Sequence, residues 1–131
     1  MPDSDELERI LNRAGIIAKS NNSWKILPIH LLAGCLRIPS VIEMLRDGAG
    51  VDSDDAWRTV DRVIAGLPRE ANRPTGTCLN GECLQILTAA AAMGEQSAVN
   101  VMLAIANHDS LAGEMLREQL GIKPNDWKRA A

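Results

Sequence analysis

Hydrophobic residues recur at helical spacing near the start of the chain. Within residues 5–20, apolar side chains return every three or four positions, which places them on one face of a helix. The members of this face are Leu7, Ile10, Leu11, Ala14 and Ala18. Asp3 and Glu6 have the spacing of a capping box at the helix start. This pattern predicts an amphipathic first helix.

The same reading predicts seven further helices and one long loop. Ser40 and Glu43 have capping-box spacing at the start of the third helix. Prolines and glycines gather in residues 66–81, which favours a loop there. The further helices are predicted at residues 27–36, 41–47, 53–67, 82–96, 98–108, 110–121 and 123–130.

The tetrapeptide EMLR occurs twice, at residues 43–46 and at residues 114–117. The order of elements around each copy is the same: a long helix, a short apolar helix, the EMLR helix and a final helix. Other positions match between the two halves, among them Ile10 with Ile86 and Gly50 with Gly121. Agreement in several separate blocks indicates an internal duplication. We therefore expect one domain over residues 1–131, with repeat one at about 5–65, the loop at about 66–81 and repeat two at about 82–130.

Composition supports helices over strands. The chain has no Phe or Tyr, and its apolar share of 46% consists mainly of residues that favour helices. Runs that alternate β-branched or aromatic residues with polar ones are scarce, which argues against an all-β fold. The fold class is therefore predicted as all-α, with two tandem four-helix repeats related by pseudo-twofold symmetry.

Charge and cysteine content limit the partners and the cellular compartment that we expect. The formal net charge is −3 and the sequence has no concentrated basic patch of the kind that tracks phosphates, so we expect no nucleic acid partner. No stretch is apolar for long enough to span a membrane, and residues 1–9 lack the pattern of a signal peptide. Three cysteines are an odd number, which fits a reducing compartment. We expect a cytoplasmic protein.

The apolar segments of the two halves also carry a family resemblance. IHLLAGCL at residues 29–36 and VNVMLAI at residues 99–105 resemble paired segments in the double repeat of the N-terminal domain of Clp ATPases, nearest to the ClpA type, which has Asn in the second repeat where the first has His. The resemblance spans roughly residues 5–130. It implies an all-α domain without catalytic activity or cofactor. In that family the domain receives adaptors and substrates for a hexameric unfoldase.

The AAA+ motor is absent from these residues, because no phosphate-binding loop with the pattern GxxxxGK[ST] occurs in the sequence. The chain resembles either a free-standing relative or an isolated domain. In members that resemble ClpC, a Glu precedes the His in each repeat and helps to bind phosphorylated arginine. Ile29 and Val99 stand at those positions, so the resemblance does not extend to phosphoarginine binding.

Two other function classes remain as alternatives. The first is a small helical metal-dependent hydrolase, with His30 or Asp52, Asp54 and Asp55 as ligands. A buried histidine bonded to the backbone and a helix N-terminus capped by acids are the plainer readings of those residues. The second is a helix-turn-helix protein that binds DNA, formed by residues 42–60, although acids begin its second helix and would repel phosphates.

The resemblance predicts a binding face between the loops before the two apolar helices, at residues 21–28 and 94–99. One side is apolar and basic and the other polar and acidic, so one asymmetric partner is expected: a Clp ATPase or protease subunit, a Clp adaptor or an apolar substrate peptide. The candidate contact residues are Trp24, Lys25, Ile29, Glu95, Gln96 and Val99.

Overall fold

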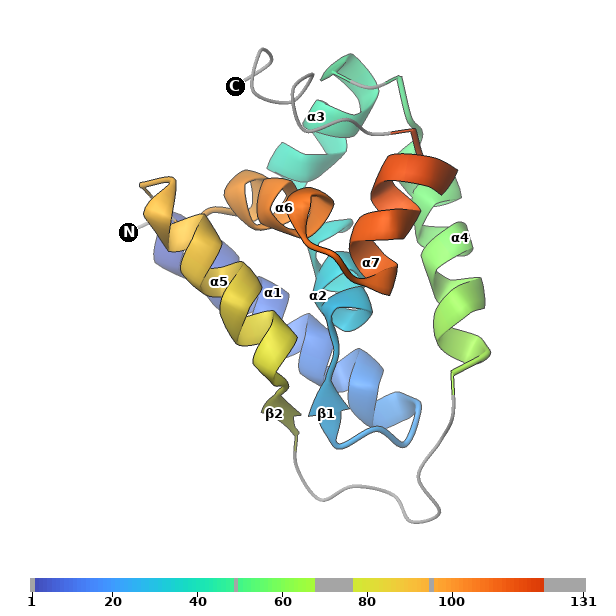
Figure 1. The fold of residues 1–131 in the computed structure, drawn as a ribbon. Helices are drawn as coiled ribbons and strands as arrows, with labels where there is room; N and C mark the ends of the chain where they lie inside the picture. The colour runs from blue at the N-terminus through green and yellow to red at the C-terminus, as the bar shows by residue number, and fades with distance from the viewer. Residues whose placement is uncertain (1, 49, 68–76, 95, 122–131) are drawn as a thin grey trace.

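The computed structural model describes residues 2–48, 50–67, 77–94 and 96–121, with side chains from Glu6 onward. Helices dominate this part of the chain (Figure 1). In repeat one they are α1 (Pro2–Ser20), α2 (Pro28–Cys35), α3 (Pro39–Gly48) and α4 (Ser53–Ala65). In repeat two they are α5 (Gly81–Ala92), α6 (Ala98–Asn107), α7 (Leu111–Glu114) and the π-helix η1 (Met115–Gln119). The predicted eighth helix at 123–130 lies outside the described residues.

The two repeats contact each other reciprocally. α1 packs on α2 and α5 packs on α6, and each of these first helices also contacts the second helix of the other repeat. α2 and α6 contact each other, while α2 also reaches α7 and α6 reaches α3. Contacts that repeat with the two halves exchanged are what an approximate twofold axis produces. The all-α repeat fold predicted from the sequence is confirmed.

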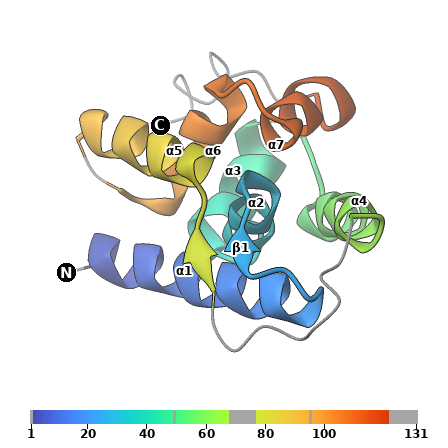
Figure 2. The same ribbon diagram turned by 60° about the horizontal axis from the view of Figure 1, so that its bottom comes forward.

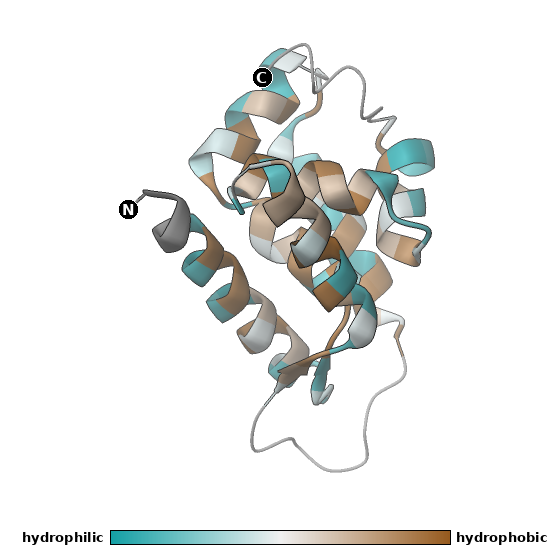
Figure 3. Cartoon of the chain, turned by 60° about the vertical axis from the view of Figure 1, so that its left-hand side comes forward, coloured by the Kyte–Doolittle hydropathy of each residue, from teal (hydrophilic) through white to brown (hydrophobic). Residues whose placement is uncertain are grey.

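The core lies where α2 and α6 meet. Every residue of α2 is buried, and the apolar side chains of α6 from Ala98 to Ala106 are buried except for half-buried Val99. α1 contributes Ile10, Ala14 and Ala18 from the predicted face. Figure 3 shows hydrophobic and hydrophilic residues alternating along α1, as expected for a helix with one face in solvent. Figure 2 shows α1 lying along one side of the molecule, with α4 at one edge.

Equivalent glycines end the EMLR helices of both repeats. Gly50 has φ +65° and Gly121 has φ +66°, a conformation that glycine adopts without steric penalty. This equality in backbone geometry agrees with the duplication inferred from the sequence.

The predicted capping roles of Glu6 and Ser40 are wrong. α1 already begins at Pro2, so Glu6 lies inside the helix. Its carboxylate accepts a hydrogen bond from the Ser40 hydroxyl at 2.8 Å and another from the Ala98 backbone N–H at 3.2 Å. Glu6 therefore links α1 to α3 and to the start of α6, a tertiary role that the local pattern could not reveal.

One short parallel pair of strands was not predicted. β1 (Lys25–Ile26) pairs with β2 (Cys78–Leu79), so that Lys25 lies opposite Cys78. The backbone N–H of Cys78 donates to the Trp24 carbonyl at 2.9 Å, and that of Asn80 donates to the Ile26 carbonyl at 3.1 Å. Strands of two residues are too short for side-chain alternation to reveal them.

Among the described residues, no single helix has both the length and the apolar character needed to cross a membrane. The pair α2 and α3, bent by 86° where they join, passes that test by length and composition alone.

Candidate functional site

A cavity of about 270 Å³ opens beside the end of α1. We call it the Trp24 cavity. Its lining residues are Asn21, Ser23, Trp24, Lys25, Leu27, His30 and Leu67. They come from the α1–α2 connection, from α2 and from the second residue after the end of α4. Two of the six predicted contact residues, Trp24 and Lys25, therefore line one cavity.

The end of α1 orients this segment. Asn22 has φ 53°, in the left-handed region that Asn tolerates better than most residues. The Asn22 N–H donates to the Lys19 carbonyl, and the Ser23 N–H reaches back to the Ala18 carbonyl at 2.9 Å. This pair of bonds is the Schellman arrangement that ends many helices. It turns the chain sharply and directs Trp24 and Lys25 to the cavity.

Trp24 is held by its backbone while its side chain stays accessible. Its carbonyl is bonded to β2, and 45% of the residue is exposed. The Lys25 ammonium lies 4.9 Å from the centre of the Trp24 ring, within the range of a cation–π contact. Lys25 itself is exposed. A fixed backbone with an accessible indole and ammonium gives this wall both apolar and cationic character.

His30 forms the inner wall and is only 1% exposed. Its Nδ1 accepts a hydrogen bond from the Leu27 N–H at 3.0 Å, which confirms the predicted backbone-bonded histidine. Burial lowers the pKa of His30 from 6.5 to about 4, so the ring is neutral at pH 7. Because Nδ1 accepts, the proton of the neutral ring is on Nε2. That buried N–H has no acceptor among the described residues.

A smaller pocket of about 90 Å³ adjoins the Trp24 cavity and shares Leu27 and Leu67 with it. We call it the Ile29 pocket. Its other lining residues are Pro28, Ile29, Glu82, Ser110, Leu111 and Ala112. Ile29 is only 2% exposed, so this predicted contact residue is a wall of a pocket and does not project from the surface.

The second group of predicted contact residues lies elsewhere. Gln96 is half-buried and its side-chain amide donates to the Leu87 carbonyl at 3.0 Å, while half-buried Val99 packs against the core. Glu95 lies outside the described residues. The α6 start is bonded to Glu6 near the beginning of α1, whereas Trp24 follows its end. At 1.5 Å per residue, the two groups are separated by roughly 20 Å along α1. Gln96 and Val99 therefore do not line the cavity that Trp24 and Lys25 line.

Sequence reasoning missed Leu27, His30 and Leu67 as parts of the site. His30 was assigned to the core on its apolar surroundings, and that assignment is correct. Leu67 belonged to a predicted helix end, about 40 positions from Trp24 along the chain, and nothing local indicates that they share a cavity. The orphaned Nε2 proton follows only from the Leu27 bond, which the sequence does not show.

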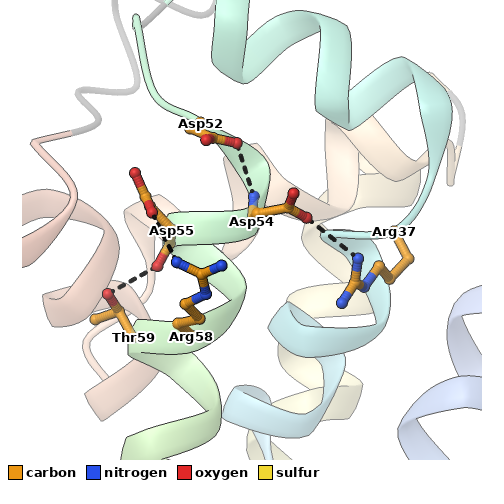
Figure 4. A network of polar contacts seen from close by, with 6 residues as sticks. All are labelled: Arg37, Asp52, Asp54, Asp55, Arg58 and Thr59. Atoms are coloured by element: carbon orange, nitrogen blue, oxygen red, sulfur yellow. Dashed lines mark hydrogen bonds and ion pairs between the residues drawn. The ribbon is translucent and has the colours of Figure 1, made fainter.

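The acids at the start of α4 form a helix cap and two surface ion pairs. The Asp52 carboxylate accepts from the Asp54 N–H at 3.0 Å, as predicted (Figure 4). Asp54 pairs with Arg37 at 3.4 Å and Asp55 pairs with Arg58 at 3.6 Å, both on the surface. No three His, Cys, Asp or Glu side chains gather as possible metal ligands in the part of the chain that the structure describes.

The thiols differ in exposure. Cys35 and Cys83 are buried, Cys78 is exposed, and all three are free. Burial raises the pKa of Cys83 to about 12, and burial also raises that of Cys35. The Cys83 thiol donates to the Ile26 carbonyl at 3.0 Å, which joins the start of α5 to β1. These two thiols stay protonated at neutral pH and serve packing.

Comparison with known proteins identifies the family of this chain. The sequence model of the Clp repeat (R) N-terminal domain matches residues 4–119. The chain belongs to the Clp repeat N-terminal domain family. Domains of this family are interaction modules of Clp chaperones. A search of curated protein sequences found no match.

Solved structures share the fold at low sequence identity. The Hsp104 N-terminal domain from Candida albicans is 21% identical, with a TM-score of 0.78 over 95% of this chain and 85% of that one. The N-terminal domain of ClpD from Arabidopsis thaliana is 18% identical, with a TM-score of 0.69 over 98% and 94%. A structure from a malarial protein secretion system is 17% identical, with a TM-score of 0.77 over 96% and 89%.

Proposed function

We propose that this Clp N-domain docks an adaptor or a substrate polypeptide of a Clp chaperone–protease system at the Trp24 cavity. Trp24 carries the proposal: a large aromatic side chain, 45% exposed, stands on a backbone held by β2 beside a cavity. Aromatic residues of this kind dominate the binding energy of many protein interfaces. The role is binding, and no chemical step is assigned to the chain.

The surroundings of Trp24 suit a polypeptide with apolar side chains. Leu27 and Leu67 line both the Trp24 cavity and the Ile29 pocket, so two hollows adjoin across shared apolar walls. Lys25 adds a positive charge on one side. A single partner that uses both hollows fits this asymmetric arrangement. The Gln96–Val99 segment, near the other end of α1, is a separate candidate contact.

Replacing Trp24 with Ala is expected to weaken partner binding by more than ~1 kcal/mol, because the variant loses the aromatic anchor. The wild-type and variant chains are immobilised and exposed to the native lysate, and captured Clp subunits and adaptors are quantified by mass spectrometry. Met93→Ala is the matched control, since Met93 is 41% exposed and lies on the α5–α6 connection. An identical set of captured Clp components for wild type and Trp24→Ala would remove Trp24 from the site.

Phosphoarginine is expected not to bind measurably. Ile29 and Val99 stand at the two positions where members that resemble ClpC have Glu. Neither residue carries a carboxylate that could pair with a guanidinium. Ile29 is also buried. Calorimetric titration of the chain with free phosphoarginine tests this expectation, with arginine as the control ligand. Tight and saturable binding of phosphoarginine alone would overturn the ligand assignment.

A further inference from the structure

The Trp24 cavity has polar groups that its own chain does not use. The Lys25 ammonium makes no ion pair with any acid among the described residues, and it lies over the indole of Trp24. The Ser23 hydroxyl is different, because it already donates to the Lys25 carbonyl at 2.7 Å. Lys25 is therefore the positive charge that this wall offers to a ligand.

His30 adds a second unused donor. Its Nδ1 is occupied by the Leu27 N–H, so the neutral ring carries its proton on Nε2. Nε2 is buried and has no partner among the described residues. A buried donor without an acceptor is costly, and such groups in native proteins call for an explanation. Because Nε2 is fully buried, a ligand oxygen in the cavity that the ring lines would supply one after side chains of the wall shift, as interface side chains commonly do on binding.

The size of the cavity limits what can occupy it. At about 270 Å³ it is slightly smaller than most pockets for drug-sized ligands, which begin at roughly 300 Å³. It suits one terminal residue better than a long internal segment. The Ile29 pocket beside it, with Leu111 and Ala112 in its wall, suits a second apolar side chain.

Side chains of opposite charge line the Trp24 cavity and the Ile29 pocket. Lys25 lines the Trp24 cavity and exposed Glu82 lines the Ile29 pocket. A peptide that ends in the Trp24 cavity would place its carboxylate on the cationic side and its backbone N–H groups toward the acid. A fatty acid has no donors for Glu82 and needs one continuous channel, so a peptide is the better match.

We propose that the Trp24 cavity binds the free C-terminus of a polypeptide whose last two residues are apolar. Lys25 and the Nε2 proton of His30 receive the terminal carboxylate, and Trp24, Leu27 and Leu67 contact the last side chain. The Ile29 pocket receives the preceding one. This inference rests on the proposed docking function and names the ligand class of the same cavity.

The test compares peptides that differ only at the terminal group. A dye-labelled hexapeptide that ends in Leu-Leu is prepared as the free acid and as the amide, and binding to the full chain is followed by fluorescence polarisation. The free acid is expected to bind at least fivefold more tightly than the amide. Equal affinity for acid and amide would overturn the proposal.

Variants of the chain sharpen the comparison. Lys25→Met keeps most of the aliphatic stem and removes the charge, and it is expected to lower the affinity for the acid at least fivefold with little effect on the amide. Lys19→Met is the control, because Lys19 is exposed on α1 and lies outside the cavity lining. Circular dichroism verifies that both variants fold. An equal loss in the two variants would contradict a specific contact with Lys25.

Two further measurements distinguish failure of the peptide proposal from failure of the docking function. Decanoate that competes with the peptide acid at equal or better affinity would assign the cavity to a lipid carboxylate and overturn the peptide proposal. If no peptide acid binds while Trp24→Ala still weakens the capture of Clp components, the C-terminal ligand is overturned and the docking function stands. Tight binding of the free acid, without comparable binding of the amide or of decanoate, supports both the C-terminal ligand and the docking function.

Discussion

Between pH 7 and pH 4.5, the wild-type chain is expected to lose about 2.5 kcal/mol more stability than the His30→Asn variant does. Burial holds the pKa of His30 at about 4 in the folded chain against 6.5 for the free side chain. The unfolded chain therefore takes up a proton first as the pH falls. The contribution is complete above pH 6.5 and is lost progressively toward pH 4.

Asn is chosen because its side-chain oxygen can accept the Leu27 N–H that His30 Nδ1 accepts at 3.0 Å. Asn100 also occupies the matching position in repeat two. Urea unfolding gives the free energy of unfolding of each protein at both pH values. Because each loss is the difference between two values for the same protein, any pH-independent effect of the substitution cancels. Carboxylates that titrate in the same window affect both proteins alike. Equal losses would show that His30 is not held neutral by burial.

Gly113→Ala is expected to destabilise the fold by about 2–3 kcal/mol, because overpacking a rigid site forces the backbone to move. A Cβ at this position would overlap the His108 carbonyl and lie 2.6 Å from that of Ile105. Arg117 Nη1 bonds the Ala106 carbonyl at 2.7 Å and the His108 carbonyl at 3.0 Å, which fixes the same backbone. Little room is left for relaxation where α7 meets the end of α6.

Gly81→Ala is the matched control. Gly81 begins α5, and a Cβ there meets nothing within 4 Å. This substitution is expected to be neutral or to stabilise the chain by up to about 1 kcal/mol through a less flexible unfolded state. Thermal unfolding of both variants beside the wild type measures the difference. Equal melting temperatures for the two variants would contradict the close approach of α7 to α6.

The sequence allowed the helices, their order and the duplication to be predicted because these follow from short-range periodicity. Ile10, Ala14 and Ala18 are buried as the spacing requires, and Asp52 caps α4 as its position before an acidic turn suggests. The predicted bounds differ from the observed ones by a few residues at helix ends. Such ends depend on individual hydrogen bonds that periodicity does not contain.

Contacts between distant segments could not be predicted in the same way. Glu6 looked like part of a local cap, yet its partners are 34 and 92 positions away. Trp24 and Lys25 are candidates because they lie in the loop before the first apolar helix, and they line a cavity. Gln96 and Val99 were paired with them by analogy between repeats. In a twofold arrangement, however, equivalent loops can lie at opposite ends of a helix, and here they do.

That separation makes one measurement decisive for the docking site. An aromatic photocrosslinking amino acid, which keeps a large apolar ring at the anchor position, is placed at position 24 in one variant and at position 93 in another. Adducts formed in living cells are identified by mass spectrometry. Both positions are exposed; position 24 follows the end of α1, and position 93 lies on the α5–α6 connection. Docking at the Trp24 cavity predicts adducts with a Clp subunit, adaptor or substrate from position 24 and few from position 93. Adducts from position 93 with none from position 24 would contradict it.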